Sequence, residues 1–367
     1  MKRRFDFDVL RVAAMLGVIY LHTAAAALQD LNNIPLWWFS NVLTAVATPA
    51  VPLFFMMSGA LLLRDARTAD WRDVLCRRVP RLLVPLLAWS ALVLAYNFLR
   101  VDRAQALDQL KNLLHEPAMV PYWFLYALIP IYLLSPMVKA MTDRLSHSGW
   151  NYMMGLWLVL TVGISTAYSF APAEWKTVFI PHYTLNVNAV GGYLGYFLLG
   201  AYLERLEKRP PRRALGLGCA VMLAVSIFGT AWDTYAHGAY SDRFTNYLNI
   251  FTVVFSALIF LLAKDCLGER EERGRFLPWL ANASFGIYLA HAPAIIAMQK
   301  LWVRLDAYVA NIPQQLLFYA GVTAACIIGV ALVSLIPGLS YLAAGLRWGK
   351  RKPAMSPAGE ENRDGKP

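Results

Sequence analysis

Runs of about 20 apolar residues, nearly free of charge, recur along the whole chain. Each run is long enough for a helix to cross a hydrocarbon core of ~30 Å. A membrane barrel would instead show shorter segments in which polar and apolar residues alternate. We therefore predict an all-α integral membrane protein, a bundle of about ten transmembrane helices. The predicted spans are 9–28, 38–63, 82–99, 121–139, 150–169, 187–204, 214–232, 246–263, 280–299 and 314–338.

All of these runs fall within residues 1–348, which we predict to form one membrane domain. Residues 349–367 are polar and rich in Pro and Gly, a composition that cannot bury enough apolar surface to fold. We predict that they form a disordered cytoplasmic tail. The connection over 100–120 carries scattered charges and is predicted to contain a short helix on the outer face.

The composition agrees with this class of protein. Apolar residues make up 58% of the chain and charged residues only 16%, whereas a soluble domain carries about 25% charge. The net charge of +11 is explained by orientation, because 27 of the 34 Lys and Arg residues fall in alternate loops on one side and 7 on the other. The positive-inside rule then places both termini in the cytoplasm. Nucleic acid is not needed to account for the charge.

Several common site types are not indicated. The four cysteines form neither a CxxC pair nor a Cys/His ligand pattern, so no disulfide framework, zinc site or other metal is expected. The chain also shows no Walker loop, dinucleotide fingerprint or GxSxG nucleophile elbow. The cysteines are Cys76, Cys219, Cys266 and Cys326.

The segment RVAAMLGVIYLHTAAA carries two ionisable residues within the first span, Arg11 and His22. Eleven residues of α-helix complete three turns plus about 20°, so both side chains lie on nearly the same face, about 16 Å apart along the axis. Polar groups in a span must face the bundle interior or a water-filled cavity. The pattern favours an anionic molecule that enters beside Arg11 and places its reactive end near His22. Histidine is the usual general base near neutral pH.

Structural interpretations stay open at this point. A buried histidine such as His22 can be a hydrogen-bonded structural group, and Arg11 can be an anchor at the membrane surface, with Asp8 one turn away. Ser58-Gly59 suits close helix packing. The arginines of RRVPR can be an orientation signal alone.

The order of several motifs resembles the membrane-bound acyltransferase 3 family. Asp8-x-x-Arg11 and Arg-x10-His are similar to the family's first span, and Arg78-x-x-Arg81 resembles its motif at the start of the third. The resemblance covers about residues 5–340. Further similar segments are VPLFFMMSGALLL (51–63), YWFLYALIPIYLLSP (122–136), GYFLLG (195–200) and SFGIYLAH (284–291).

This resemblance implies an integral O-acyltransferase of the bacterial inner membrane, multi-pass within the lipid bilayer. It implies acetyl-CoA as donor and a cell-surface or lipid-linked glycan as acceptor. NVLTAVATPAVPLFFMMSG looks most similar to members that O-acetylate enterobacterial common antigen, although other members transfer succinyl groups.

The resemblance also suggests roles for residues. Arg78 and Arg81, with Arg77, would bind the phosphates of the donor, since residues three apart are neighbours on a helix and a guanidinium suits phosphate. Arg11 would contact the donor further in or hold the cavity wall through Asp8. His22 would act as general base or form an acyl-imidazole. Candidates to stabilise an oxyanion are Trp123, Asn186, Ser284 and Tyr288, and His291 is a candidate to line the same cavity or to make a structural hydrogen bond.

Two other classes of function fit parts of the pattern. A transporter or flippase of a glycan or lipid-linked intermediate would also have many spans and buried polar groups. Such proteins often contain inverted repeats with matched broken helices, and we find no such symmetry. A non-catalytic sensor of lipid or glycan would not need Arg11 and His22 on one face.

Overall fold

The computed structural model of the chain is an all-helical bundle over the residues that it describes, 3–180, 191–268, 270, 274–305 and 309–346. The predicted tail, 349–367, lies outside them. The helices, with short 3₁₀ or π turns labelled η, are α1 (Phe5–Gln29), α2 (Ile34–Ala47), α3 (Ala50–Leu62), η1 (Ala66–Ala69), α4 (Trp71–Asp73), η2 (Val74–Arg78), α5 (Val79–Arg100), α6 (Arg103–Lys111), η3 (Val120–Tyr122), α7 (Trp123–Thr142), α8 (His147–Trp157), η4 (Leu158–Gly163), α9 (Ile164–Phe170), η5 (Ala173–Phe179), α10 (Gly192–Arg205), α11 (Arg212–His237), α12 (Ile250–Leu267), α13 (Phe276–Arg304), α14 (Ile312–Ser334) and α15 (Leu339–Ala344).

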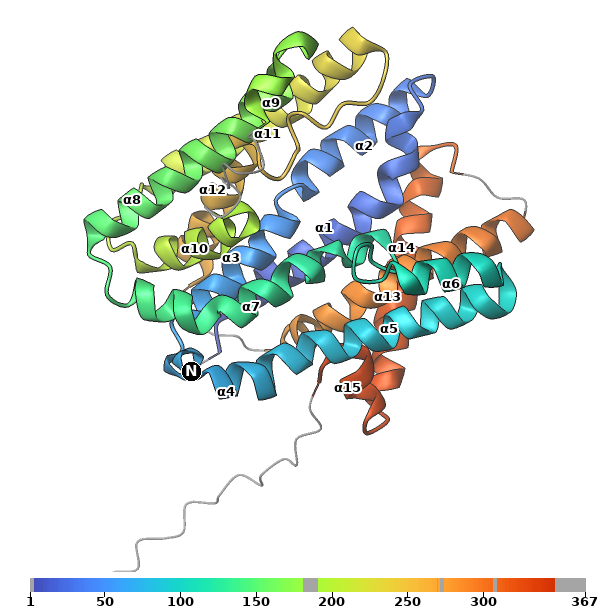
Figure 1. The fold of residues 1–367 in the computed structure, drawn as a ribbon. Coiled ribbons are helices and arrows are strands. Elements are labelled where there is room, and N and C mark those ends of the chain that lie inside the picture. Colours follow the sequence, from blue (N-terminus) through green and yellow to red (C-terminus); the bar gives the residue numbers. More distant parts are fainter. Residues whose placement is uncertain (1–2, 181–190, 269, 271–273, 306–308, 347–367) are drawn as a thin grey trace, which may run out of the picture.

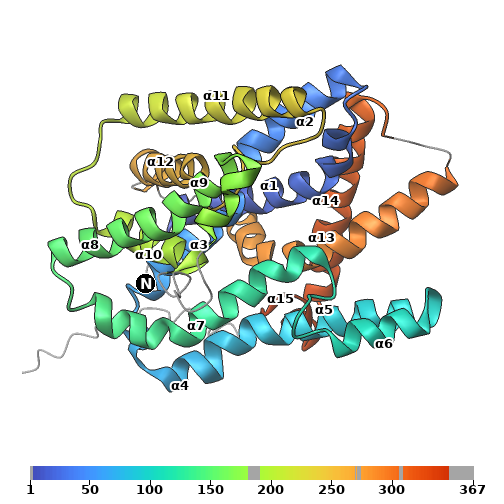
Figure 2. The same ribbon diagram turned by 45° about the horizontal axis from the view of Figure 1, so that its top comes forward.

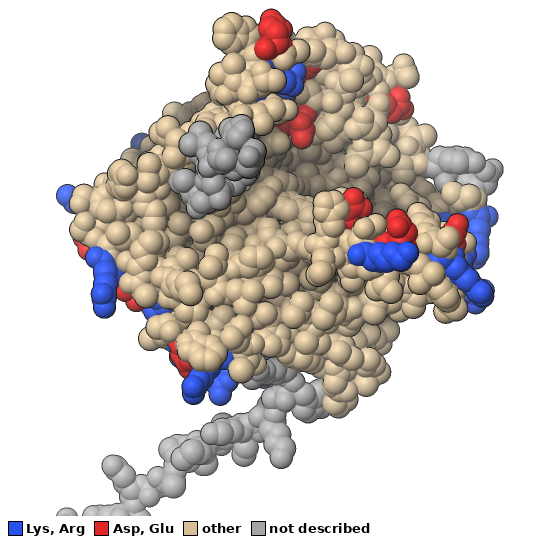
Figure 3. All heavy atoms as spheres, viewed as in Figure 1, with Lys and Arg blue, Asp and Glu red and all other residues tan. Residues whose placement is uncertain are grey.

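The predicted membrane-bundle class is confirmed. Within the described residues, 9 helical stretches are long and apolar enough to cross a membrane, and they match nine of the predicted spans. The sixth predicted span, 187–204, corresponds to the 14-residue α10, and its first residues lie outside the described part of the chain. Charged side chains gather at the rim of the face in Figure 3, and a broad uncharged surface lies between them.

Helix α1 is the central element of the bundle. It contacts α2, α3, α12, α13 and α14, and the other helices surround it in both ribbon views (Figures 1 and 2). Its first turn carries Asp6 and Asp8, both buried, where carboxylates suit the positive end of a helix. Asp8 is bound by Arg3, and Asp6 by Arg4, which also binds Glu204 of α10. These ion pairs fix the start of α1.

Helices α3 and α10 cross so closely that their backbones touch. A methyl group at Gly59 would lie 1.7 Å from the carbonyl oxygen of Phe197, and one at Gly200 would lie 1.9 Å from that of Met56. Only glycine fits such a crossing. Close packing therefore accounts for Gly59 in the Ser58-Gly59 motif.

We expect Gly59→Ala to destabilise the protein by about 1–3 kcal/mol, because the added methyl group must push two backbones apart. The measurement is the thermal unfolding temperature in detergent. Gly216→Ala in α11 is the matched control, since no atom beyond its chain neighbours and its own helix backbone lies within 4 Å of the added methyl group. There alanine's better helix propensity predicts no loss of stability. Equal unfolding temperatures for the two variants would contradict the close crossing.

Candidate active site

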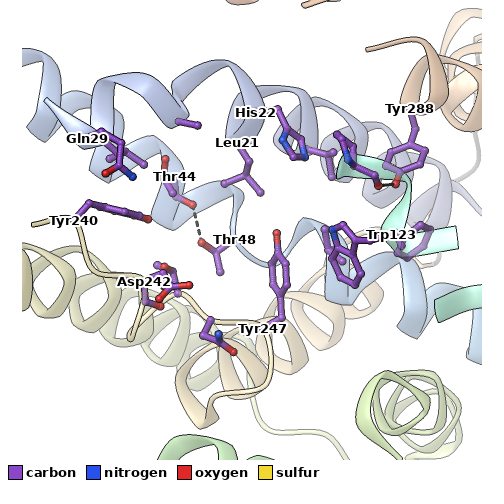
Figure 4. Close-up of a pocket in the computed structure, with 18 residues that line it drawn as sticks. Leu21, His22, Gln29, Thr44, Thr48, Trp123, Tyr240, Asp242, Tyr247 and Tyr288 are labelled. Carbon is purple, nitrogen blue, oxygen red and sulfur yellow. Dashed lines mark hydrogen bonds between the residues drawn. The ribbon is translucent and has the colours of Figure 1, made fainter. Parts of the chain in front are cut away.

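A cavity of about 330 Å³ surrounds His22, and we name it the histidine cavity. Figure 4 shows the imidazole projecting from α1 toward the rings of Trp123 and Tyr247 on the opposite wall. Those two rings stack with centroids 5.9 Å apart. The polar and aromatic lining comprises His22, Gln29, Thr44, Thr48, Trp123, Phe124, Tyr240, Asp242, Thr245, Asn246, Tyr247 and Tyr288.

Within the described residues, His22 makes no hydrogen bond or ion pair. The reading of His22 as a hydrogen-bonded structural group therefore has no support in the structure. A histidine that lines a cavity and has no hydrogen-bond partner keeps a ring nitrogen for a ligand.

His291 lies beside His22 but is fully buried and does not line the cavity. The two ring centroids are 5.2 Å apart. Nδ1 of His291 donates to the carbonyl of Tyr288, because a carbonyl can only accept. In the neutral ring Nε2 is then an acceptor, and this atom is buried with no hydrogen-bond partner. Of the two alternatives for His291, the structural hydrogen bond is present.

A second cavity, of about 300 Å³, contains Arg11, and we name it the arginine cavity. Ser58 and Tyr132 line it beside Arg11, and they approach one another, with 3.5 Å between the hydroxyl oxygens. Arg81 lines it from α5, and Ser284 and Tyr288 line it from α13.

Arg11 is not paired with Asp8 in this arrangement. Arg3 binds the carboxylate of Asp8, and no ion pair joins Asp8 to Arg11 among the described residues. A direct ion pair to Asp8 therefore does not hold Arg11 at the wall, although the charge of Asp8 lies near enough to act on the guanidinium. Arg11 presents its charge to the cavity instead.

A third cavity, of about 440 Å³, lies at the end of the bundle where the chain begins, next to α4 (Figure 1). We name it the anion cavity, because its charged lining consists of four arginines and two aspartates, a net charge of +2. The predicted set Arg77, Arg78 and Arg81 meets here. The complete charged lining is Asp65, Arg67, Asp73, Arg77, Arg78 and Arg81.

A π-helical turn brings these arginines together. The N–H of Val79 donates to the carbonyl of Val74, five residues back, and Pro80 has no N–H to offer the carbonyl of Cys76. Arg77 and Arg78 end this turn, and α5 then carries Arg81. The wide turn changes the simple helical spacing assumed from sequence but keeps all three side chains on one cavity.

Two aspartates that sequence reasoning missed orient Arg78. Its Nη2 donates to Asp65 at 2.8 Å and its Nε to Asp73 at 3.1 Å. Hydrogen bonds from Arg67, and to a smaller extent from Arg78, lower the pKa of Asp65 to about 2. This carboxylate is therefore charged throughout the neutral range. A guanidinium has five N–H groups, so Arg78 can hold both carboxylates and still donate to an incoming anion.

The three cavities adjoin one another in series. Arg81, Leu82 and Tyr132 line both the anion cavity and the arginine cavity. Phe124 and Tyr288 line both the arginine cavity and the histidine cavity. A line of cavities thus runs from the arginines of α5 past Arg11 to His22.

The remaining predicted residues fall along this line. The hydroxyl of Tyr288 donates to the carbonyl of Pro121, and that of Ser284 donates to the carbonyl of Ala281 at 2.8 Å. Trp123 lines the histidine cavity. Asn186 lies outside the described residues. Sequence reasoning missed Tyr132, because an aromatic residue in an apolar stretch carries no local sign of the cavity that it lines. It also missed Tyr247, which belongs to the connection between α11 and α12.

The comparisons with known proteins give the class and the family. Residues 4–333 match the acyltransferase domain of the acyltransferase 3 family. Fold and sequence together define a membrane-embedded acyltransferase. The chain belongs to the acyltransferase 3 family. Searches of curated proteins and of solved structures found no match.

Proposed function

We propose that the protein transfers an acetyl group from cytoplasmic acetyl-CoA to a hydroxyl of a cell-surface or lipid-linked glycan at the bacterial inner membrane. The observation that supports this best is the line of three cavities from a cationic end to an unpartnered histidine. A flexible anionic donor could lie along such a line with its phosphates at one end and its thioester at the other. The sequence resemblance to the enzymes that act on enterobacterial common antigen suggests a GlcNAc-containing glycan.

The anion cavity would hold the donor's phosphates. Its net charge favours an anion, and Arg77, Arg78 and Arg81 present guanidinium groups to one space. Guanidinium groups match phosphate oxygens in pairs, which gives orientation as well as attraction. Arg11 would meet the donor further in, on the wall of the arginine cavity.

His22 would supply the chemistry. As general base its imidazole takes the proton of the acceptor hydroxyl while the hydroxyl oxygen attacks the thioester carbon. The C–S bond then breaks, and the CoA thiolate leaves and takes the proton from the imidazolium, which restores the neutral base. In the alternative route the imidazole nitrogen attacks the thioester carbon, the C–S bond breaks, and CoA leaves as the thiol with the proton from the imidazole. The oxygen of the acceptor hydroxyl then attacks the acetyl carbon, the C–N bond breaks, and the hydroxyl proton returns to the released imidazole.

The hydrogen bonds narrow the choice of oxyanion donor. Each hydroxyl has one proton, and those of Tyr288 and Ser284 are already given to carbonyl groups. Trp123 lines the cavity beside His22 and carries one indole N–H. We therefore favour Trp123 among the candidates within the described residues.

The test is transfer of labelled acetyl from acetyl-CoA to membrane glycans by the purified protein in detergent. Mass spectrometry of surface glycans from cells with and without the gene should show the loss of one acetyl group. A flippase would move glycan in proteoliposomes without incorporating label, and that result would overturn the proposal.

A further inference from the structure

A fourth cavity, of about 420 Å³, adjoins the histidine cavity on the side away from the arginines. The two share Tyr240, Asp242 and Asn246, which all belong to the connection between α11 and α12. In Figure 4, Tyr240 and Asp242 lie at the opposite end of the histidine cavity from Tyr288. We name the fourth space the outer cavity. It extends the line of cavities beyond His22.

A buried carboxylate holds the connection that forms this shared wall. Asp233 of α11 is 1% exposed and accepts from Arg243 at 2.9 Å and from the hydroxyl of Ser241. The backbone N–H of Ser241 donates to Thr234, and the side chain of Asn249 donates to the carbonyl of Arg243. The chain thus fixes both ends of the segment that carries Asp242. A fixed wall with exposed polar groups suits recognition of a ligand.

The charges of the outer cavity suit a neutral polar ligand. Asp233 forms an ion pair with Arg243, and its Oδ1 also lies 3.2 Å from Nδ1 of His237. The other two charges of the lining are opposite in sign, Lys176 and Asp242, and Lys176 lies over the ring of Tyr168. The lining of the outer cavity therefore has no surplus of positive charge that would select an anion.

The side chains of the outer cavity match the chemistry of a sugar. Asp242 has no ion pair among the described residues, so its oxygens are acceptors for hydroxyl groups, and Asn246 can donate or accept. Tyr168 and Tyr240 add aromatic rings, whose apolar faces suit the C–H face of a sugar ring.

We propose that the outer cavity binds the sugar next to the one that is acetylated, so that the acceptor is an oligosaccharide rather than a single sugar. This inference rests on the proposed function, since it places the acetylated sugar beside His22. Asp242 and Asn246 then bond to this second sugar from the wall that both cavities share, and Tyr168, which lines the outer cavity alone, also contacts it. These residues set the preference for acceptor length.

The test compares acceptors of two lengths. The glycan from cells carrying the gene is O-deacetylated with mild base and used either intact or cut to single sugars. Wild-type protein should show a higher kcat/KM for the intact glycan. We call kcat/KM for the intact glycan divided by kcat/KM for the single sugar the length ratio. In Asp242→Asn and in Tyr168→Ala the length ratio should fall by about 2- to 10-fold, the effect of one or two hydrogen bonds or a lost ring contact. Both side chains are exposed, so folding should be retained.

Asp108→Asn is the matched control, an exposed aspartate on α6 that lines none of the four cavities. Its length ratio should equal that of the wild type. Equal kcat/KM for the two acceptors in the wild type, or unchanged ratios in both variants, would overturn the outer subsite while leaving acetyl transfer intact. Absence of transfer to either acceptor would instead contradict the proposed function, and the outer subsite with it.

Discussion

His22→Ala is expected to lower the rate of acetyl transfer by about 10²–10⁴-fold, the usual contribution of a general base. The side chain lines the cavity and makes no hydrogen bond or ion pair within the described residues, so its removal should leave the fold unchanged. The measurement is kcat for transfer to glycan together with the thermal unfolding temperature. The loss should appear in kcat with little change in KM for acetyl-CoA, whose phosphates are placed elsewhere.

His115→Ala is the control, because His115 lies in the connection after α6, is exposed, and lines none of the cavities. It should keep full activity. Full activity in His22→Ala would remove the assigned role of His22. The two chemical routes separate in the absence of acceptor: an acyl-imidazole gives a stoichiometric burst of CoA from the wild type, and a general base gives none.

The class of fold follows from the sequence because a helix in lipid must be apolar over its whole length, so every span appears as a long apolar run. A break inside a span changes only one or two residues and is harder to recognise. The predicted span 38–63 is two helices, α2 and α3, that meet at Thr48 and Pro49. Pro49 has no N–H to donate, and the hydroxyl of Thr48 bonds to the carbonyl of Thr44 at 2.8 Å.

The candidate site could be predicted only where one helix carries the pattern. Helical spacing places Arg11 and His22 on one face, and both side chains line the series of cavities. The carboxylate of Asp65 on Arg78 could not be found this way, because Asp65 reaches it from the loop after α3. The same holds for Asp242, which meets the histidine cavity only through the packing of α11 and α12.

Arg78→Ala is expected to raise KM for acetyl-CoA by about 10- to 100-fold, because a hydrogen bond to a charged group contributes about 1.5–3 kcal/mol. The change lowers the net charge of the anion cavity from +2 to +1. Folding should persist, since Asp65 keeps its ion pair with Arg67 and Asp73 keeps that with Arg77. The measurement is KM and kcat over a range of salt, and the rise in KM of the wild type with salt should be smaller in the variant.

Arg72→Ala is the matched control for this prediction. Arg72 precedes the same π turn, lies over the ring of Trp71 and does not line the anion cavity. Its KM should equal that of the wild type.

Acetyl-CoA without the 3′-phosphate gives a second readout. The wild type should lose affinity for this analogue, and Arg78→Ala should discriminate less between it and acetyl-CoA. Asp65 stays ionised in this assay, since Arg67 and Arg78 hold its pKa at about 2, so any change of KM between pH 6 and 8 must come from other groups. An unchanged KM in Arg78→Ala would place the phosphates away from these arginines. The arginines of the anion cavity would then act only as an orientation signal.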